Sequence, residues 1–93
     1  MHIGLLTFEI FISESESLKD KRMIINGLKD RLRKRYNVAV AELAYQDKWQ
    51  RSELGVVTIG NSHKIVEESL HKIFSYLDNN DNFELINHRF DHM

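Results

Sequence analysis

The run His2–Ile12, HIGLLTFEIFI, constrains the fold more than any other part of this chain. Its side chains alternate between two sides, and both sides carry apolar residues: Leu6 and Phe8 on one, Leu5 and Phe11 on the other. A strand that is apolar on both sides belongs inside a sheet whose second face is at least partly covered. We therefore expect a central strand here, with neighbours on both edges.

A helix should follow this strand. Ser17 and Asp20 form an S-x-x-D start signal, in which the hydroxyl caps the helix and the carboxylate favours its positive end. The apolar side chains then recur in one stripe at helical spacing, so one face of the helix packs on the sheet. The residues of this stripe are Leu18, Ile25, Leu28, Leu32 and Tyr36.

The remaining elements complete a recognisable order. We predict strands at Val38–Tyr45 and Ser52–Ile59, a helix at His63–Leu77, and a last strand at Phe83–Phe90. The order β-α-β-β-α-β predicts an α+β, ferredoxin-like sandwich. Its four-stranded antiparallel sheet would have the order 4-1-3-2, with both helices on one face. This order makes the first strand central, as its apolar pattern requires.

Composition limits the function classes. Ninety-three residues predict a single domain spanning 1–93, and the absence of cysteine excludes disulfides, zinc–thiolate sites and thiol catalysis. No apolar run reaches the roughly 20 residues of a membrane span, and no signal-peptide pattern is seen, so we expect a cytoplasmic protein. No phosphate-loop, dinucleotide or zinc-protease motif occurs. We therefore expect no enzymatic activity, no catalytic residues, no cofactor and no small-molecule substrate.

The charge is unevenly distributed. Lys19–Arg35 contains eight basic and two acidic residues, a net +6, whereas the rest of the chain carries five basic and twelve acidic residues, a net −7. A cationic helix can bind phosphates without reading bases, although a solvated helix face is an equally open interpretation. The candidate RNA-binding residues are Lys19, Lys21, Arg22, Lys29, Arg33, Lys34 and Arg35.

The only tryptophan, Trp49, lies between the second and third strands. If Leu54, Val56 and Thr58 face the helices and no bulge intervenes, Trp49 faces away from the helices, near Phe11; a bulge would instead turn it into the core. The open sheet face would then carry a large apolar patch, which we expect a second copy of the chain to cover. The candidate interface residues are Ile3, Leu5, Phe11, Trp49, Arg51, Val57 and Ile59.

Five histidines raise the question of a metal site. His88 and His92 are four residues apart, and His2 begins the strand that should neighbour the last one, so a surface site is conceivable. No carboxylate is spaced to join them. We predict no metal site.

Three segments carry a resemblance to a known family: SLKDKR (Ser17–Arg22), NVAVAE (Asn37–Glu42) and QDKWQRSELGV (Gln46–Val56). In order and spacing they resemble the YlxP-like family of small bacterial proteins, over nearly the whole chain. The resemblance implies a ferredoxin-like fold. Family members are often encoded near genes for translation initiation factor and ribosome-binding factor A, which implies a ribosomal or RNA partner. The motif residues in this chain are Ser17, Leu18, Lys19, Lys21, Arg22, Asp47, Trp49, Gln50 and Arg51.

Two functional hypotheses result. The leading one is a non-enzymatic module that binds RNA or the ribosome through its basic first helix. The alternative is a homodimeric protein-interaction module that uses the sheet face around Trp49.

Overall fold

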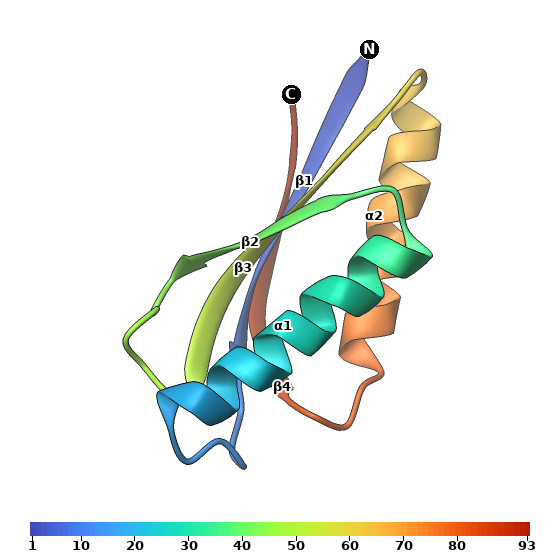
Figure 1. Cartoon of the computed structure of the whole chain (residues 1–93). Helices are drawn as coiled ribbons and strands as arrows, with labels where there is room; N and C mark the ends of the chain where they lie inside the picture. The colour runs from blue at the N-terminus through green and yellow to red at the C-terminus, as the bar shows by residue number, and fades with distance from the viewer.

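The elements follow the predicted order along the chain. A computed structural model describes all 93 residues. The elements are β1 (His2–Phe11), α1 (Leu18–Arg35), β2 (Ala39–Ala44), β3 (Arg51–Gly60), α2 (His63–Asp78) and β4 (Glu84–His92) (Figure 1). Their bounds differ from the predicted ones by at most two residues, because the pattern of side chains does not mark where backbone pairing stops.

The strands form one antiparallel sheet in the order β2-β3-β1-β4, which reads 4-1-3-2 from the other edge. β1 pairs with β3 from His2 to Phe11 and with β4 from Gly4 to Phe11. Its inner position explains why it is the most apolar strand. Each edge strand carries one register shift, after Glu42 in β2 and opposite Glu9–Ile10 in β4.

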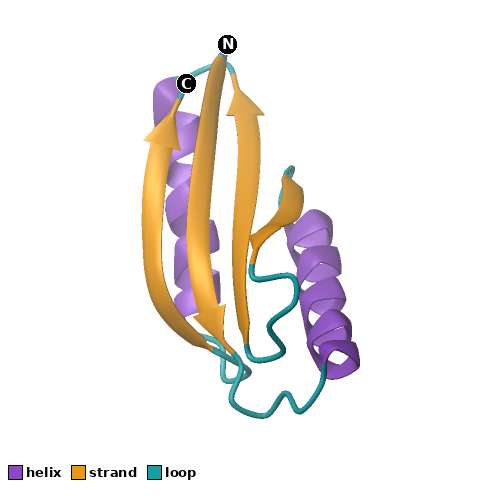
Figure 2. Ribbon diagram, turned by 90° about the vertical axis from the view of Figure 1, so that its left-hand side faces the viewer, coloured by secondary structure: helices purple, strands orange, loops and turns teal.

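Both helices lie on one face of the sheet, and the core fills the space between (Figure 2). Leu54, Val56 and Thr58 of β3 are buried on the helix side. α2 packs on β1, β3 and β4, whereas α1 packs on β2, so the two helices rest on different parts of the sheet. The buried apolar side chains of the helices are Ile25, Leu28, Leu32, Val66, Leu70, Ile73 and Leu77.

The helix ends agree with the sequence signals. The Ser17 hydroxyl accepts a hydrogen bond from the Asp20 amide at 3.0 Å, and Ser62 does the same for Ile65 at 3.2 Å. The last turn of α1 carries Arg33, Lys34 and Arg35, where cations interact favourably with the helix dipole. Neither helix is long and apolar enough to cross a membrane.

Candidate functional site

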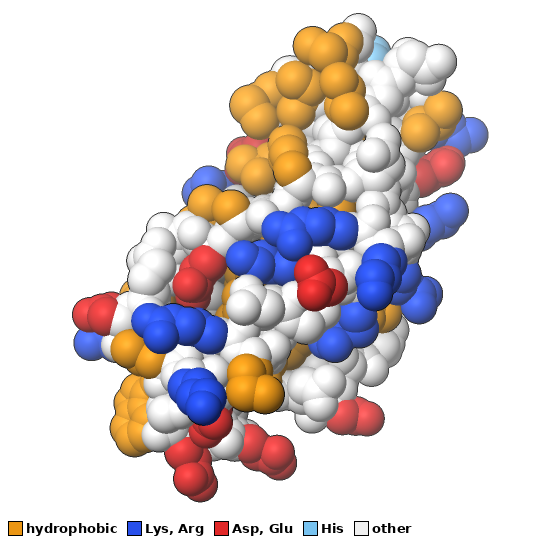
Figure 3. Space-filling model, viewed as in Figure 1, with side chains coloured by type: hydrophobic (Ala, Val, Ile, Leu, Met, Phe, Trp, Pro, Cys, Tyr) orange, Lys and Arg blue, Asp and Glu red, His pale blue; other side chains and the backbone are white.

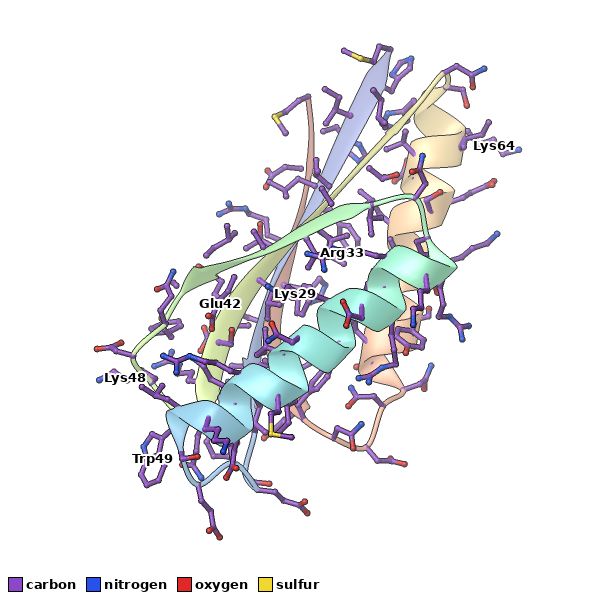
Figure 4. All side chains as sticks on the ribbon, in the orientation of Figure 1. Lys29, Arg33, Glu42, Lys48, Trp49 and Lys64 are labelled. Carbon is purple, nitrogen blue, oxygen red and sulfur yellow. The ribbon has the colours of Figure 1, made fainter.

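The predicted RNA-binding residues do not form one surface. Lys19, Arg22, Arg33, Lys34 and Arg35 are exposed, and Lys29 is half-buried. Figure 4 shows Lys29 and Arg33 projecting from α1 toward β2. Arg33 also pairs with Asp30 at 3.5 Å on the helix surface.

The prediction that Lys21 binds RNA is wrong. Its side chain is 1% exposed, so it cannot contact a phosphate. Its ammonium group donates to the carbonyls of Tyr45 at 2.6 Å and Arg51 at 3.2 Å, and lies 3.0 Å from a Glu42 carboxylate oxygen. Ser52 donates to the same Glu42 oxygen at 2.6 Å. All three ammonium protons are therefore used, and Lys21 joins the start of α1 to the loop between β2 and β3.

The family's recurring segments meet at this junction. SLKDKR supplies the Ser17 cap and Lys21, NVAVAE supplies Glu42, and QDKWQRSELGV supplies the Arg51 carbonyl. Gln50 adds a second connection, since its side-chain amide donates to the Ser13 carbonyl at 3.1 Å. Helical spacing carried the signal that Lys21 faces inward, because it lies four residues before Ile25 and seven before Leu28, within the apolar stripe.

Trp49 lies in the loop before β3 and not on the sheet. It is 51% exposed, which excludes the core position. Figure 4 shows it at the tip of the loop, beside Lys48 and near the start of α1. The residue paired with Phe11 is Arg51. β3 begins at Arg51, so Trp49 lies before the strand pairing that was expected to place it beside Phe11.

Arg51 does face the open sheet side, but in an ionic network. Its guanidinium pairs with the Glu9 carboxylate, to which Asn87 also donates at 3.2 Å, and lies 4.3 Å from the centre of the Tyr45 ring. The hydrogen bond from Arg51 lowers the pKa of Glu9 below its ordinary value, against the opposing effect of burial. This half of the open face is thus polar. Tyr45 has a left-handed backbone, with φ of 65°, that reverses the chain at this point.

The other half of the open face is apolar. Ile3, Leu5 and Val57 are partly buried there, and Ile59 is 53% exposed. They border two adjacent hollows of about 400 and 280 Å³. The prediction missed Leu43, which contacts the Gly55 position and is 49% exposed. Alternation along β2 could have found it, because Ala39, Ala41 and Leu43 point to the same side and line the same hollow.

A groove between α1 and α2 is the largest concavity, with a volume of about 800 Å³. It is lined by Arg31 and Arg35 from α1, Tyr36 after it, and Lys72 and Tyr76 from α2. The Arg35 guanidinium lies 4.7 Å from the centre of the Tyr76 ring, and the two tyrosine rings meet edge to face at 6.3 Å. The predicted RNA-binding set included only Arg35 of these residues. Arg31 faces α2 and Lys72 faces α1, and only the packing of the two helices shows this.

The histidines gather differently from the pattern considered above. His88 packs on Phe74, with ring centres 4.3 Å apart, so His2, His88 and His92 do not form a site. Instead, His92 meets His63 and Glu67 of α2, and the potential ligand atoms of these three residues lie within 4.8 Å of one another.

Comparison with known proteins identifies relatives over most of the chain. A family model described as "Protein of unknown function (DUF503)" matches residues 3–90. The chain is also 32% identical over 76 residues to the "Uncharacterized protein YlxP" of Bacillus subtilis (strain 168), an alignment that covers 82% of this chain and 83% of that protein.

Proposed function

This chain belongs to the DUF503 family, which includes YlxP-like proteins, and from its structure we propose that it is a non-enzymatic module that binds RNA, with the ribosome as its setting. The observation that carries the proposal is the groove between α1 and α2, where cations and partly exposed aromatic rings occur together. The ferredoxin-like assignment is part of the proposal; the element order and the strand order support it.

The groove has the two kinds of side chain that single-stranded RNA requires. Arg31, Arg35 and Lys72 supply charge, and arginine forms bidentate hydrogen bonds with phosphate oxygens. Tyr36 and Tyr76 are partly exposed, and unpaired bases stack on such rings. None of the three cations is in an ion pair, so no acidic neighbour competes with a phosphate.

The surrounding charge favours the same side of the molecule. Figure 3 shows Lys and Arg side chains gathered across the α1 side of the molecule. Such a field raises the rate at which an anionic partner arrives, even where individual residues make no contact. Lys19, Arg22, Lys29, Arg33 and Lys34 therefore contribute by attraction, and the groove residues by contact.

Two charge-reversal variants separate contact from attraction. The groove variant replaces Arg31, Arg35 and Lys72 by Glu, and the flank variant replaces Arg22, Lys29 and Arg33 by Glu, with the same change in net charge. Binding of a labelled single-stranded RNA and co-sedimentation with ribosomes are measured for both. We expect the groove variant to lose at least about tenfold in RNA affinity, because each charge-assisted hydrogen bond contributes about 1.5 kcal/mol or more, and the flank variant to lose less.

Circular dichroism of both variants checks that they are folded. Equal losses of RNA affinity in the two variants would mean that RNA binds across the whole basic side and not in the groove. Unchanged binding by both variants would refute the groove and the basic side as the site, and a wild-type chain that binds neither RNA nor ribosomes would refute RNA binding. Capture of partners from a lysate, with and without nuclease, adds an independent check: partners that survive nuclease treatment would contradict an RNA-mediated function.

The second candidate function is a homodimeric interaction module. The observation that favours it is the apolar half of the open sheet face, formed by Ile3, Leu5, Leu43, Val57 and Ile59. A second copy related by a two-fold axis would bury both patches together. Trp49 lies in the loop before β3 and borders neither hollow of this patch, so the proposed dimer does not depend on it.

Sedimentation velocity at tens of micromolar tests the dimer. Ile59→Glu places a charge in the patch and should give a monomer, whereas Lys64→Glu, on exposed α2, should leave the dimer intact. A wild-type chain that sediments strictly as a monomer would exclude this function.

A further inference from the structure

The amino-terminal part of α2 lies unusually close to the sheet. A Cβ atom on Gly4 would lie 2.5 Å from Val66 and 2.7 Å from Leu70, and one on Gly60 would lie 3.0 Å from Val66. Two glycines on neighbouring strands therefore allow the helix to approach at this end. The first turns of α2 consequently come within reach of the end of β4.

The end of β4 is held in place. His92 is the cross-strand neighbour of Gly4 on the helix side of the sheet. Because Gly4 has no side chain, nothing at that position lies between His92 and α2. The next residue, Met93, exchanges two backbone hydrogen bonds with Ile3, at 2.9 and 3.3 Å. The imidazole of His92 is thus positioned by paired backbone on both sides.

Two residues of α2 face this imidazole. His63 and Glu67 are four residues apart and share one side of the helix. The rings of His63 and His92 are 4.6 Å apart, and His63 Nε2 lies 3.1 Å from a Glu67 carboxylate oxygen. One potential ligand atom from each of the three residues lies within 4.8 Å of the other two.

We propose that His63, Glu67 and His92 bind a divalent transition-metal ion of the Zn²⁺ type. Two imidazoles and one carboxylate are a common ligand set for zinc, whereas Ca²⁺ and Mg²⁺ prefer oxygen ligands alone. In a tetrahedral zinc site, neighbouring ligand atoms lie about 3.4 Å apart, as follows from metal–ligand bonds of about 2.1 Å. The ligand side chains on α2 are about half exposed, so small rotations close the remaining difference.

His71 lies next to Glu67, where a residue that orients this ligand without binding the metal is expected. His71 Nε2 lies 3.7 Å from the second carboxylate oxygen of Glu67, the one that does not meet His63. A small rotation of the exposed His71 side chain would bring it to hydrogen-bond distance, at which such partners orient a ligating carboxylate. Three protein ligands leave one position for water. The bound ion would hold β4 and α2 together, two elements whose ligand residues meet only in the folded chain.

The test measures Zn²⁺ binding to the full chain without a histidine tag. Isothermal titration with zinc chloride at pH 7.5 should give one ion per chain. His63→Ala, Glu67→Gln and His92→Ala should each weaken binding by at least about tenfold, since even outer partners of metal ligands change affinity 10- to 100-fold. His88→Ala is the matched control, because it removes a histidine of the same strand that packs on Phe74.

Thermal unfolding gives a second readout. In EDTA the ligand variants and His88→Ala should unfold at similar temperatures. Added Zn²⁺ should raise the unfolding temperature of the wild type and of His88→Ala but not of the ligand variants, since an ion that binds only the folded state stabilises it. Absence of stoichiometric binding, or binding that survives both Glu67→Gln and His92→Ala, would overturn the proposal.

Discussion

Lys21 shows what a single residue can do inside a basic segment. By composition it is one of eight cations between Lys19 and Arg35, yet its ammonium group is buried against two carbonyls and the Glu42 carboxylate. A buried charge is tolerated only when it is paired and hydrogen-bonded. The contribution of Lys21 is therefore to hold the β2–β3 loop against α1 and not to attract a partner.

Replacement of Lys21 by methionine should be strongly destabilising. It leaves Glu42 without its cation and the Tyr45 and Arg51 carbonyls without their donor, so we expect a loss of about 3 kcal/mol in unfolding free energy. Urea denaturation measures it. Lys19→Met, at an exposed neighbour, should stay within about 0.5 kcal/mol of the wild type.

A double variant sharpens this prediction. Lys21→Met with Glu42→Gln removes both charges, so the double variant should lose less than the sum of the two single losses. Strict additivity would show that Lys21 and Glu42 do not interact in solution.

Glu9 should make the unfolding free energy depend on pH in the acidic range. Its carboxylate is buried beneath the Arg51 guanidinium, whose hydrogen bond lowers its pKa below the ordinary value of about 4.3. Between the lowered pKa and the ordinary one, the unfolded chain binds a proton that the folded chain does not. The unfolding free energy therefore rises with pH in this window, and the contribution is lost as pH falls through the lowered pKa.

The Glu9→Gln variant should show a weaker dependence of stability on pH below about 4.3. Urea titrations at several acidic pH values measure it. Glu14→Gln removes an exposed carboxyl that is in no ion pair and should keep the wild-type slope. An unchanged slope in Glu9→Gln would mean that the Glu9–Arg51 pair is not formed in solution.

At the scale of elements, the approach of α2 to the sheet depends on Gly4. Its backbone angle does not demand glycine, since no glycine here has a positive φ. What demands it is space, because the side chains of Val66 and Leu70 occupy the Cβ position. Gly27 differs: a Cβ there would meet only the flexible end of Arg31, at 3.3 Å.

Two glycine-to-alanine variants should therefore have opposite effects. Gly4→Ala should destabilise by about 1–3 kcal/mol, as overpacking does, and should also weaken the zinc binding proposed above by moving α2. Gly27→Ala should stabilise by up to about 1 kcal/mol, because alanine is the better residue inside a helix. Thermal or urea unfolding of both variants measures this, and destabilisation by Gly27→Ala would show that a partner or neighbour needs that space.

The two candidate binding surfaces lie on opposite sides of the molecule. The helix side carries the basic groove, and the opposite sheet face carries the apolar patch next to the Glu9–Arg51 network. RNA binding and dimer formation would therefore use different sides and need not exclude each other. The two termini lie together at one end, where the His63–Glu67–His92 cluster is also found (Figure 1).

The charge on the helix side predicts a marked salt dependence. If the three groove cations each neutralise a phosphate of single-stranded RNA, the logarithm of affinity should fall with the logarithm of salt concentration with a slope of about −2. The groove variant should show a clearly flatter slope. A slope near zero for the wild type would exclude phosphate contacts.

The elements and their order could be predicted from the sequence. Alternation in His2–Ile12, the Ser17 cap and the helical stripes are local properties, and each reflects which face of an element is buried. The inner position of β1 was also expected, because apolar residues on both faces are typical of a strand inside a sheet. The family was evident from three short segments, and the comparisons confirm it.

The sites depended on tertiary structure. Which groups the Lys21 ammonium contacts, where β3 begins relative to Trp49, and which cations face the groove are set by contacts between elements distant in the sequence. The same holds for Glu67, the carboxylate that sequence spacing could not connect with His92. Periodicity fixes the face of each element, whereas the depth and angle at which two elements pack depend on side chains such as Gly4 and Val66 that meet only in the folded chain.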